Sequence, residues 1–194
     1  MVPVHGGGLK APLLVWALAI AFLLLVASLL IGSFTKPELP AYQVGPSTGG
    51  VYTLDASAGD RWQRFDFARN AVVDSGSWDI AFRRNHVITA PNSEALDLGV
   101  LRLDSTVDVP ADGYVATAFG ADTVNPAIGK WYAYSMWSHL LTSNHHLYAV
   151  RTADGRFVLL EILAYYCRQV GSACYTIRYK TSRPRTTGSP GARE

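Results

Sequence analysis

The chain has 194 residues, of which 49% are hydrophobic and 16% are charged, and its formal net charge is +2 at pH 7. This composition excludes a wholly disordered chain, and the small net charge gives no reason to expect nucleic acid as a partner. Because domains cluster near about 100–150 residues, the length predicts one domain with an attached segment.

The attached segment is a run without charged residues over 11–34. As a helix it would span about 36 Å at about 1.5 Å per residue, more than the hydrocarbon core of a bilayer. A cleaved signal peptide is the alternative, but its apolar region is shorter, about 7–15 residues, and Leu29–Phe34 is a poor cleavage site. A lipoprotein anchor is not expected, because no cysteine lies near this helix. We predict an N-terminal cytoplasmic segment over 1–10 and a retained transmembrane helix over 11–34.

Residues 35–50 carry several prolines and glycines without periodicity, which predicts a semi-extended linker. Short apolar runs then alternate with Gly, Pro, Asn and Asp, as is typical of all-β domains. The fold class that we predict is an all-β, antiparallel β-sandwich-like domain over 51–180, preceded by one transmembrane α-helix. The predicted strands are 51–56, 62–67, 77–85, 96–103, 114–119, 147–151, 156–166 and 175–180.

Two of these strands form a predicted hairpin. Leu147–Arg151 and Arg156–Tyr166 are separated by a turn that contains Asp154-Gly155, and such a pair supplies the positive φ that tight hairpins need. Side chains alternate between the faces of a strand, and the more apolar set should face the core. The alternation places Val158, Leu160 and Ile162 on the core face and Phe157, Leu159 and Glu161 on the other.

The two cysteines, Cys167 and Cys174, flank a probable turn at Gly171-Ser172. A disulfide would contribute roughly 2.5 kcal/mol by the chain-entropy estimate. Two free thiols are the alternative, whereas a metal site lacks further clustered ligands. An oxidised pair implies a location outside the cytoplasm. Charges flank the helix almost evenly, so the cysteines decide the expected orientation: a single pass through the inner membrane, with the C-terminal domain in the periplasm.

Several ordered motifs in the domain resemble the HmuY family. The resemblance covers about 51–180 and implies an all-β exported domain whose best-known family members capture heme. The motifs that carry it are Ser77–Asn85, Trp131-Tyr132 with Tyr134, His139, Leu147–Gly155, Tyr165-Tyr166 and Tyr175–Tyr179.

The resemblance makes the histidines of the domain candidate heme ligands. Two imidazoles from separate loops could sandwich an iron, with Met136 as a thioether alternative; solvent-facing loop histidines are the other interpretation. The candidates are His86, His139, His145 and His146. Adjacent side chains on a strand point to opposite faces, so His145 and His146 cannot chelate one ion together. No cofactor or metal is expected, and heme b belongs to the alternative function.

No catalytic constellation stands out, so we expect a protein without enzymatic activity. The aromatic residues Trp131, Tyr132, Tyr134 and Trp137 predict an interface, although a ligand platform or a β-sandwich core needs the same residue types. Arg83-Arg84 could bind a propionate or a lipid phosphate, or simply form a solvated strand end. Residues 181–194 are rich in Ser, Thr, Gly and Pro and predict a flexible basic tail.

Two functions remain open. The first is a periplasmic accessory subunit, structural or stabilising, of a bioenergetic membrane protein complex, either respiratory or photosynthetic. Small residues in the helix favour close helix packing with such partner subunits, within membrane lipid. The second is a membrane-anchored protein that captures heme as a small-molecule ligand.

Overall fold

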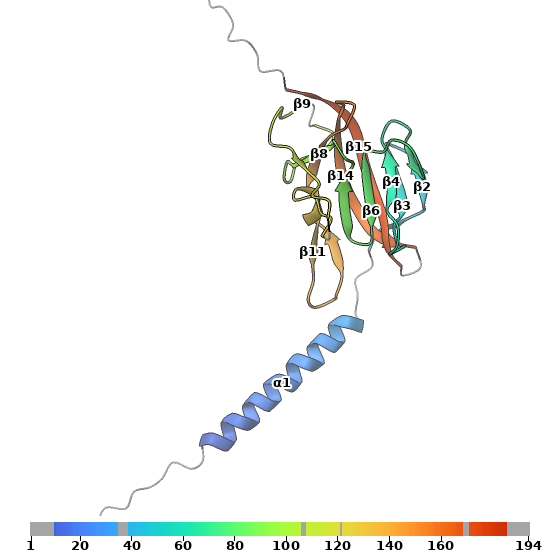
Figure 1. Ribbon diagram of the computed structural model, residues 1–194. Helices are drawn as coiled ribbons and strands as arrows, with labels where there is room; N and C mark the ends of the chain where they lie inside the picture. Colours follow the sequence, from blue (N-terminus) through green and yellow to red (C-terminus); the bar gives the residue numbers. More distant parts are fainter. Residues whose placement is uncertain (1–9, 35–38, 106–107, 121, 169–170, 186–194) are drawn as a thin grey trace, which may run out of the picture. The chain divides into compact units, whose positions relative to one another are not determined.

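The computed structural model describes residues 10–34, 39–105, 108–120, 122–168 and 171–185 (Figure 1). The chain forms two units. The helix unit contains the N-terminal helix and residues 134–140, and the β domain contains residues 39–133 and 141–185. Each unit is described by itself.

The helix unit contains α1, Lys10–Phe34, as one uninterrupted α-helix. The span from Pro12 to Phe34 has a mean hydropathy of 2.9, so it is long and apolar enough to cross a membrane by length and composition. Pro12 sits in the first turn, where its missing N–H breaks no helical hydrogen bond. The predicted apolar helix is confirmed, and its retention in the mature protein stays a prediction.

The β domain consists of a nine-stranded sheet, a four-stranded sheet and a two-stranded hairpin, with one short 3₁₀ helix, η1, at Ile128–Lys130. This architecture confirms the predicted all-β fold class. The path of the nine-stranded sheet is β10 (Val115–Ala116), β8 (Glu94–Asp97), β13 (Leu147–Arg151), β14 (Phe157–Cys167), β15 (Ser172–Pro184), β3 (Val51–Asp55) and β2 (Gly45–Ser47). Off this path, β1 (Ala41–Tyr42) pairs with β14 and β9 (Asp108–Val109) pairs with β15.

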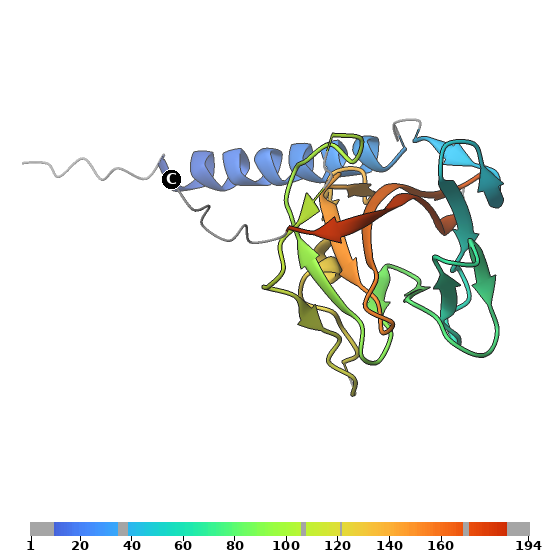
Figure 2. The ribbon, with the colours of Figure 1, turned by 90° about the horizontal axis from the view of Figure 1, so that it is seen from above.

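The four-stranded sheet lies beside the larger one (Figure 2). Its order is β5 (Ala71–Val73), β4 (Gln63–Asp66), β6 (Ile80–Arg83) and β7 (His86–Thr89). Aromatic rings join the two layers: Phe82 meets Tyr175 at a centroid distance of 4.7 Å, and Phe65 meets Tyr179 at 5.7 Å. The hairpin pairs β11 (Tyr132–Tyr134) with β12 (Leu141–Ser143). The two sheets therefore form the layers of a sandwich-like domain.

The long β14 strand at the centre is buried on both faces. Val158, Leu160 and Ile162 lie in the main core with residues of the smaller sheet, as the alternation predicts. The opposite face is not open to solvent: Leu159 packs in a second cluster with Leu103 and Val109. A loop and a short strand that are remote in sequence cover this face, and the alternation within β14 could not reveal them.

Four predicted boundaries are corrected. The expected linker over 35–50 contributes β1 and β2, which pair with β14 and β3. The strand expected over 96–103 ends at Asp97, because Gly99 turns the chain at a φ of +72°. The strand expected over 77–85 begins only at Ile80. The expected tail is ordered as far as Pro184, since β15 pairs there with β9, while residues 186–194 lie outside the described residues.

Candidate functional site

The disulfide is formed as predicted. Cys167 and Cys174 are joined, with their Cα atoms 4.9 Å apart, and no free cysteine remains in the chain. They close the turn between β14 and β15 (Ser172–Pro184), where the sulfur of Cys167 lies 3.3 Å from the position that a Cβ on Gly171 would take. The turn therefore has little room for a side chain at that glycine. The disulfide therefore links β14 and β15 covalently at this end of the large sheet.

An aromatic cluster packs beneath this turn. Trp131 is fully buried and meets Tyr165 and Tyr175 at centroid distances of 5.2 and 5.0 Å. Its indole N–H donates a hydrogen bond of 3.0 Å to the backbone oxygen of Asn85. Burial raises the pKa of Tyr175 well above its usual range. The prediction of Trp131 as an interface residue is corrected, because its side chain belongs to the core.

The other predicted interface residues are more accessible. Tyr132 is half-buried, and its hydroxyl accepts a hydrogen bond of 3.0 Å from the Asn85 side-chain amide. Tyr134 and Trp137 are 47% and 48% exposed. An interface that uses these exposed rings stays a prediction.

Two of the candidate histidines, His86 and His139, lie in different units. His86 is exposed at the start of β7. His139 belongs to the helix unit, where its Nδ1 lies 2.6 Å from the hydroxyl of Tyr134. The backbone at His139 has a φ of +56°, as suits a tight loop.

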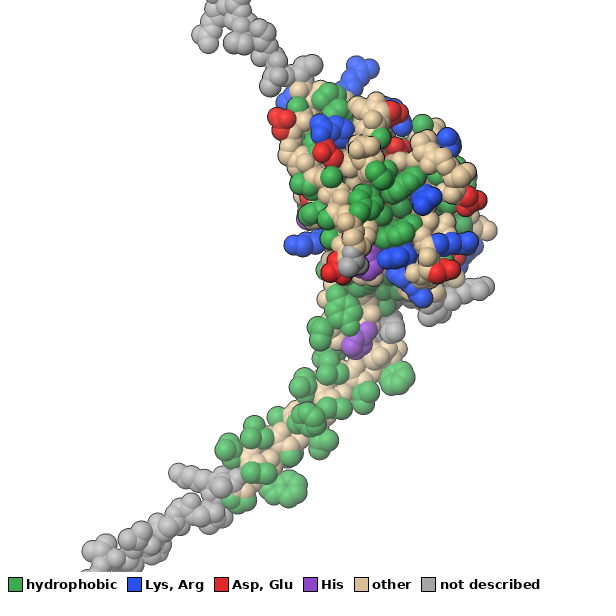
Figure 3. All heavy atoms as spheres, viewed as in Figure 1, with side chains coloured by type: hydrophobic (Ala, Val, Ile, Leu, Met, Phe, Trp, Pro, Cys, Tyr) green, Lys and Arg blue, Asp and Glu red, His purple; other side chains and the backbone are tan. Residues whose placement is uncertain are grey.

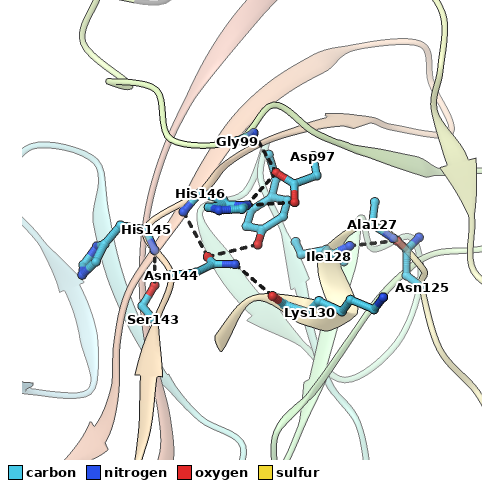
Figure 4. A network of polar contacts seen from close by, with 11 residues as sticks. Asp97, Gly99, Asn125, Ala127, Ile128, Lys130, Ser143, Asn144, His145 and His146 are labelled. Atoms are coloured by element: carbon cyan, nitrogen blue, oxygen red, sulfur yellow. Dashed lines mark hydrogen bonds and ion pairs between the residues drawn. The ribbon is translucent and has the colours of Figure 1, made fainter. Parts of the chain in front are cut away.

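His145 and His146 point away from each other (Figure 4). The ring of His146 contacts the Asp97 carboxylate at 2.9 Å, whereas the ring of His145 approaches Glu161 at 3.5 Å. The Asn144 side chain joins the segment before β13 to the end of η1: it accepts a hydrogen bond from the His146 backbone N–H and donates one to the Lys130 carbonyl. The divergent side chains agree with the prediction that these two histidines cannot chelate one ion.

Three cavities lined by described residues do not bring two of the candidate heme ligands together. One of about 340 Å³ lies beside Tyr52, Leu54 and Arg61, and another of about 390 Å³ is lined by residues around Arg61 and Trp62. A third, of about 100 Å³, includes one histidine, His145. In the part of the chain that the structure describes, no group of three or more His, Cys, Asp or Glu side chains is placed to hold a metal ion.

A buried carboxylate helps to hold the smaller sheet. Asp79 accepts a hydrogen bond of 2.8 Å from the Phe67 backbone N–H, and the Arg156 guanidinium lies 3.8 Å away. Burial raises the pKa of Asp79 above its ordinary value, although the Phe67 hydrogen bond and Arg156 oppose that shift. These contacts join the segment before β6 to Phe67 and to the turn before β14, so we assign Asp79 a structural role.

Arginines gather at the end of the β domain that carries the disulfide. We call the side chains of Arg61, Arg83, Arg84 and Arg168 the arginine end; Asp60 and Asp74 line the same cavity as Arg61. Arg83 lies over the Trp62 ring at 4.5 Å, and the backbone N–H of Arg84 donates to the Ala56 carbonyl at 2.9 Å. In Figure 3, Lys and Arg side chains gather along the lower right edge of the β domain. Sequence analysis singled out only Arg83 and Arg84, because Arg61 and Arg168 join them through tertiary structure alone.

The comparisons with known proteins agree on the fold. No protein-family model and no curated protein matches the chain. Among solved structures, a candidate lipoprotein from Bacteroides fragilis has a TM-score of 0.59 and 16% identity, covering 70% of this chain and 93% of that one. A candidate HmuY-like heme-binding protein from Bacteroides vulgatus has a TM-score of 0.58 and 22% identity, covering 73% and 97%.

A third solved structure, the apo HmuY analog of Tannerella forsythia, has a TM-score of 0.56 and 14% identity, covering 68% of this chain and 94% of that one. The β domain therefore has an HmuY-like fold, which confirms the resemblance predicted from the sequence motifs. The apolar helix and the likeness to a candidate lipoprotein indicate a membrane-anchored or exported protein.

Proposed function

We propose that this chain is a single-pass, membrane-anchored accessory subunit without enzymatic activity, and that its HmuY-like domain binds a partner in a bioenergetic membrane protein complex. The observation that carries the proposal is α1: it is long and apolar enough to span a bilayer, and none of its most hydrophobic stretch is buried. Such a surface needs lipid or neighbouring helices around it.

Three further features support the proposal. Tyr134 and Trp137 expose the aromatic side chains that anchor protein interfaces. The Cys167–Cys174 disulfide suits a domain outside the cytoplasm, with the N-terminus inside. The rings of His139 and His146 already contact the Tyr134 hydroxyl and the Asp97 carboxylate, which is the reason why we propose a partner protein and not heme as the main ligand. A respiratory or photosynthetic complex is the partner class that we propose.

The test is gentle detergent extraction of the native membrane, followed by size separation and identification of co-migrating proteins. We expect the chain to co-migrate with pigment- or heme-bearing membrane proteins. A harsher detergent that dissociates complexes provides the control, since it should release the chain alone. If the chain runs alone even after gentle extraction, near the size expected for 21.1 kDa with a detergent belt, the accessory-subunit proposal is wrong.

Heme capture is the second candidate, and the likeness to a candidate heme-binding protein favours it. Its ligands would come from His86, His139, His145 or His146. Titrating the full-length chain with hemin separates the two candidates, and we expect no stoichiometric site. A sharp low-spin Soret band that saturates at one equivalent, and that is lost when one of these histidines is replaced, would instead establish heme capture.

A further inference from the structure

A polar cavity lies at the β5 edge of the smaller sheet. Its volume is about 390 Å³, and it is lined by residues 60–64, which lead into β4, together with Val73 and Asp74 at the end of β5. The two segments lie side by side because the register pairs Arg64 with Val73. The volume falls within the range of about 300–1,000 Å³ that is usual for small-molecule sites in proteins.

The charges that line this cavity cancel. Two carboxylates, Asp60 and Asp74, line it together with two guanidinium groups, Arg61 and Arg64. All four residues are exposed, and none of them forms an ion pair with another described residue. The cavity therefore has little electrostatic preference for an anion or a cation, but it offers several donors and acceptors of hydrogen bonds.

An aromatic ring adds an apolar surface to the same cavity. Trp62 is half-buried, and the Arg83 guanidinium lies over its ring at 4.5 Å. The Arg64 guanidinium lies over the ring of Trp78 at 5.7 Å. Because such contacts attract a cation to the face of a ring, they hold both Trp62 and Arg64 in place beside the cavity before a ligand binds.

A second cavity adjoins the first one. Its volume is about 340 Å³, and Arg61 and Gln63 line both cavities. The second cavity adds the ring of Tyr52 and one carboxylate, Asp55, which accepts a hydrogen bond of 2.9 Å from the Ser57 backbone N–H. A ligand longer than a single ring therefore has room to lie across both cavities, with an aromatic side chain in each.

We propose that these two cavities bind a neutral oligosaccharide. A sugar ring has apolar C–H faces that pack on aromatic rings, and its hydroxyl groups both donate and accept hydrogen bonds. Carboxylates accept from hydroxyl groups, guanidinium groups donate to them, and the amide of Gln63 does both. The nearly balanced charges match a neutral glycan better than a charged ligand. This inference concerns the β domain alone and goes beyond the accessory-subunit role.

The test is saturation-transfer difference NMR on the full-length chain, in micelles of a detergent without a sugar headgroup. The probes are three neutral oligosaccharides: maltotetraose, cellotetraose and N-acetylchitotetraose. We expect saturation transfer to at least one of them, strongest at the C–H protons of the sugar rings. High salt should leave the transfer unchanged, because salt screens charges and a neutral ligand carries none.

Trp62→Ala should weaken binding about tenfold, because the aromatic surface of the cavity is lost. Asp74→Ala should weaken it as well, and this change at an exposed residue tests the site even if Trp62→Ala fails to fold. The matched controls are Trp137→Ala and Asp112→Ala, whose exposed residues line neither cavity. Both controls should bind like the native chain.

Three results would each overturn the glycan site: no transfer to any of the three probes, transfer that disappears in high salt, or affinities that are the same in the cavity variants and in their controls. The accessory-subunit proposal is tested separately by detergent extraction, so either proposal can fail without the other.

Discussion

The single residue Trp131 links the β11–β12 hairpin to the core of the β domain. Its ring is fully buried against Tyr165 and Tyr175, whereas Trp137, six positions later, is 48% exposed. Both tryptophans belong to one aromatic segment, so composition alone gives them the same role. Tertiary packing separates them into a core residue and a surface residue.

Replacing Trp131 by alanine should destabilise the domain by about 3–5 kcal/mol, because the change leaves a large cavity and removes the hydrogen bond to Asn85. Trp137→Ala provides the matched control and should change stability by no more than about 0.5 kcal/mol. Urea unfolding of the full-length chain in a mild detergent, followed by near-ultraviolet circular dichroism, measures both. Similar losses in the two variants would contradict the burial of Trp131.

Asp79 should give the domain a measurable dependence of stability on pH. Burial raises its folded-state pKa, so its stabilising contribution is complete below the pKa of the unfolded chain and is lost as pH rises through the folded pKa. In the Asp79→Asn variant, the side-chain amide oxygen can still accept the hydrogen bond from the Phe67 N–H, but the side chain cannot ionise. The unfolding free energy of the variant, relative to the native protein, should therefore increase as pH rises from the acid range towards neutrality.

Asp154→Asn is the control of opposite sign. Hydrogen bonds from Thr152 and Arg156 lower the pKa of Asp154, so its contribution is present at neutral pH and is lost as pH falls. The stability of this variant, relative to the native protein, should decrease as pH rises. If the Asp79 variant follows the same trend, the attraction of Arg156 outweighs desolvation at that site.

The β14 and β15 pair shows at the scale of elements how far sequence reasoning extends. The hairpin turn at Asp154-Gly155, the core face of β14 and the disulfide all followed from local patterns, because turn chemistry and alternation act over a few residues. The second buried face and the true end of β15 did not. Both depend on β9 and on the loop that precedes it, which meet these strands only after the chain has folded.

The same limit applies to the candidate site. The arginines at 83 and 84 are adjacent in sequence and could be singled out, but Arg61 and Arg168 carry no motif of their own. The histidines, in contrast, were singled out by the sequence, but the directions of their side chains could not be predicted. Four of them in a domain that resembles the HmuY family suggested a ligand pair, yet their directions depend on the backbone of individual loops, such as the positive φ of His139 and His145.

Ending the chain after Lys180 should destabilise the domain by at least about 2 kcal/mol, because residues 181–185 pair with both β14 and β9 and cover Val109. Ending it after Arg185 is the matched control and should leave stability unchanged. Thermal unfolding of the two truncated chains in the same detergent provides the comparison. Equal stability would restore the boundary that the sequence predicted at residue 181.

At the level of the whole molecule, residues 35–40 connect α1 to β1 and so link the helix unit to the β domain. If α1 spans a bilayer, as we propose, the tether raises the effective concentration at which the β domain meets a partner in the same membrane.

The parallel pairing of β1 with β14 also determines how the domain withstands force. A pull that reaches the β domain along the backbone from α1 enters it at Leu39 and passes first to β1, whose partners are Tyr166 and Cys167. A pull along the strands shears β1 against β14, so its hydrogen bonds are loaded together and do not open one at a time. The strand that receives this force is covalently fixed, through Cys167, to the neighbouring strand at Cys174. Traction along this path is thereby shared between β14 and β15 before it reaches the core.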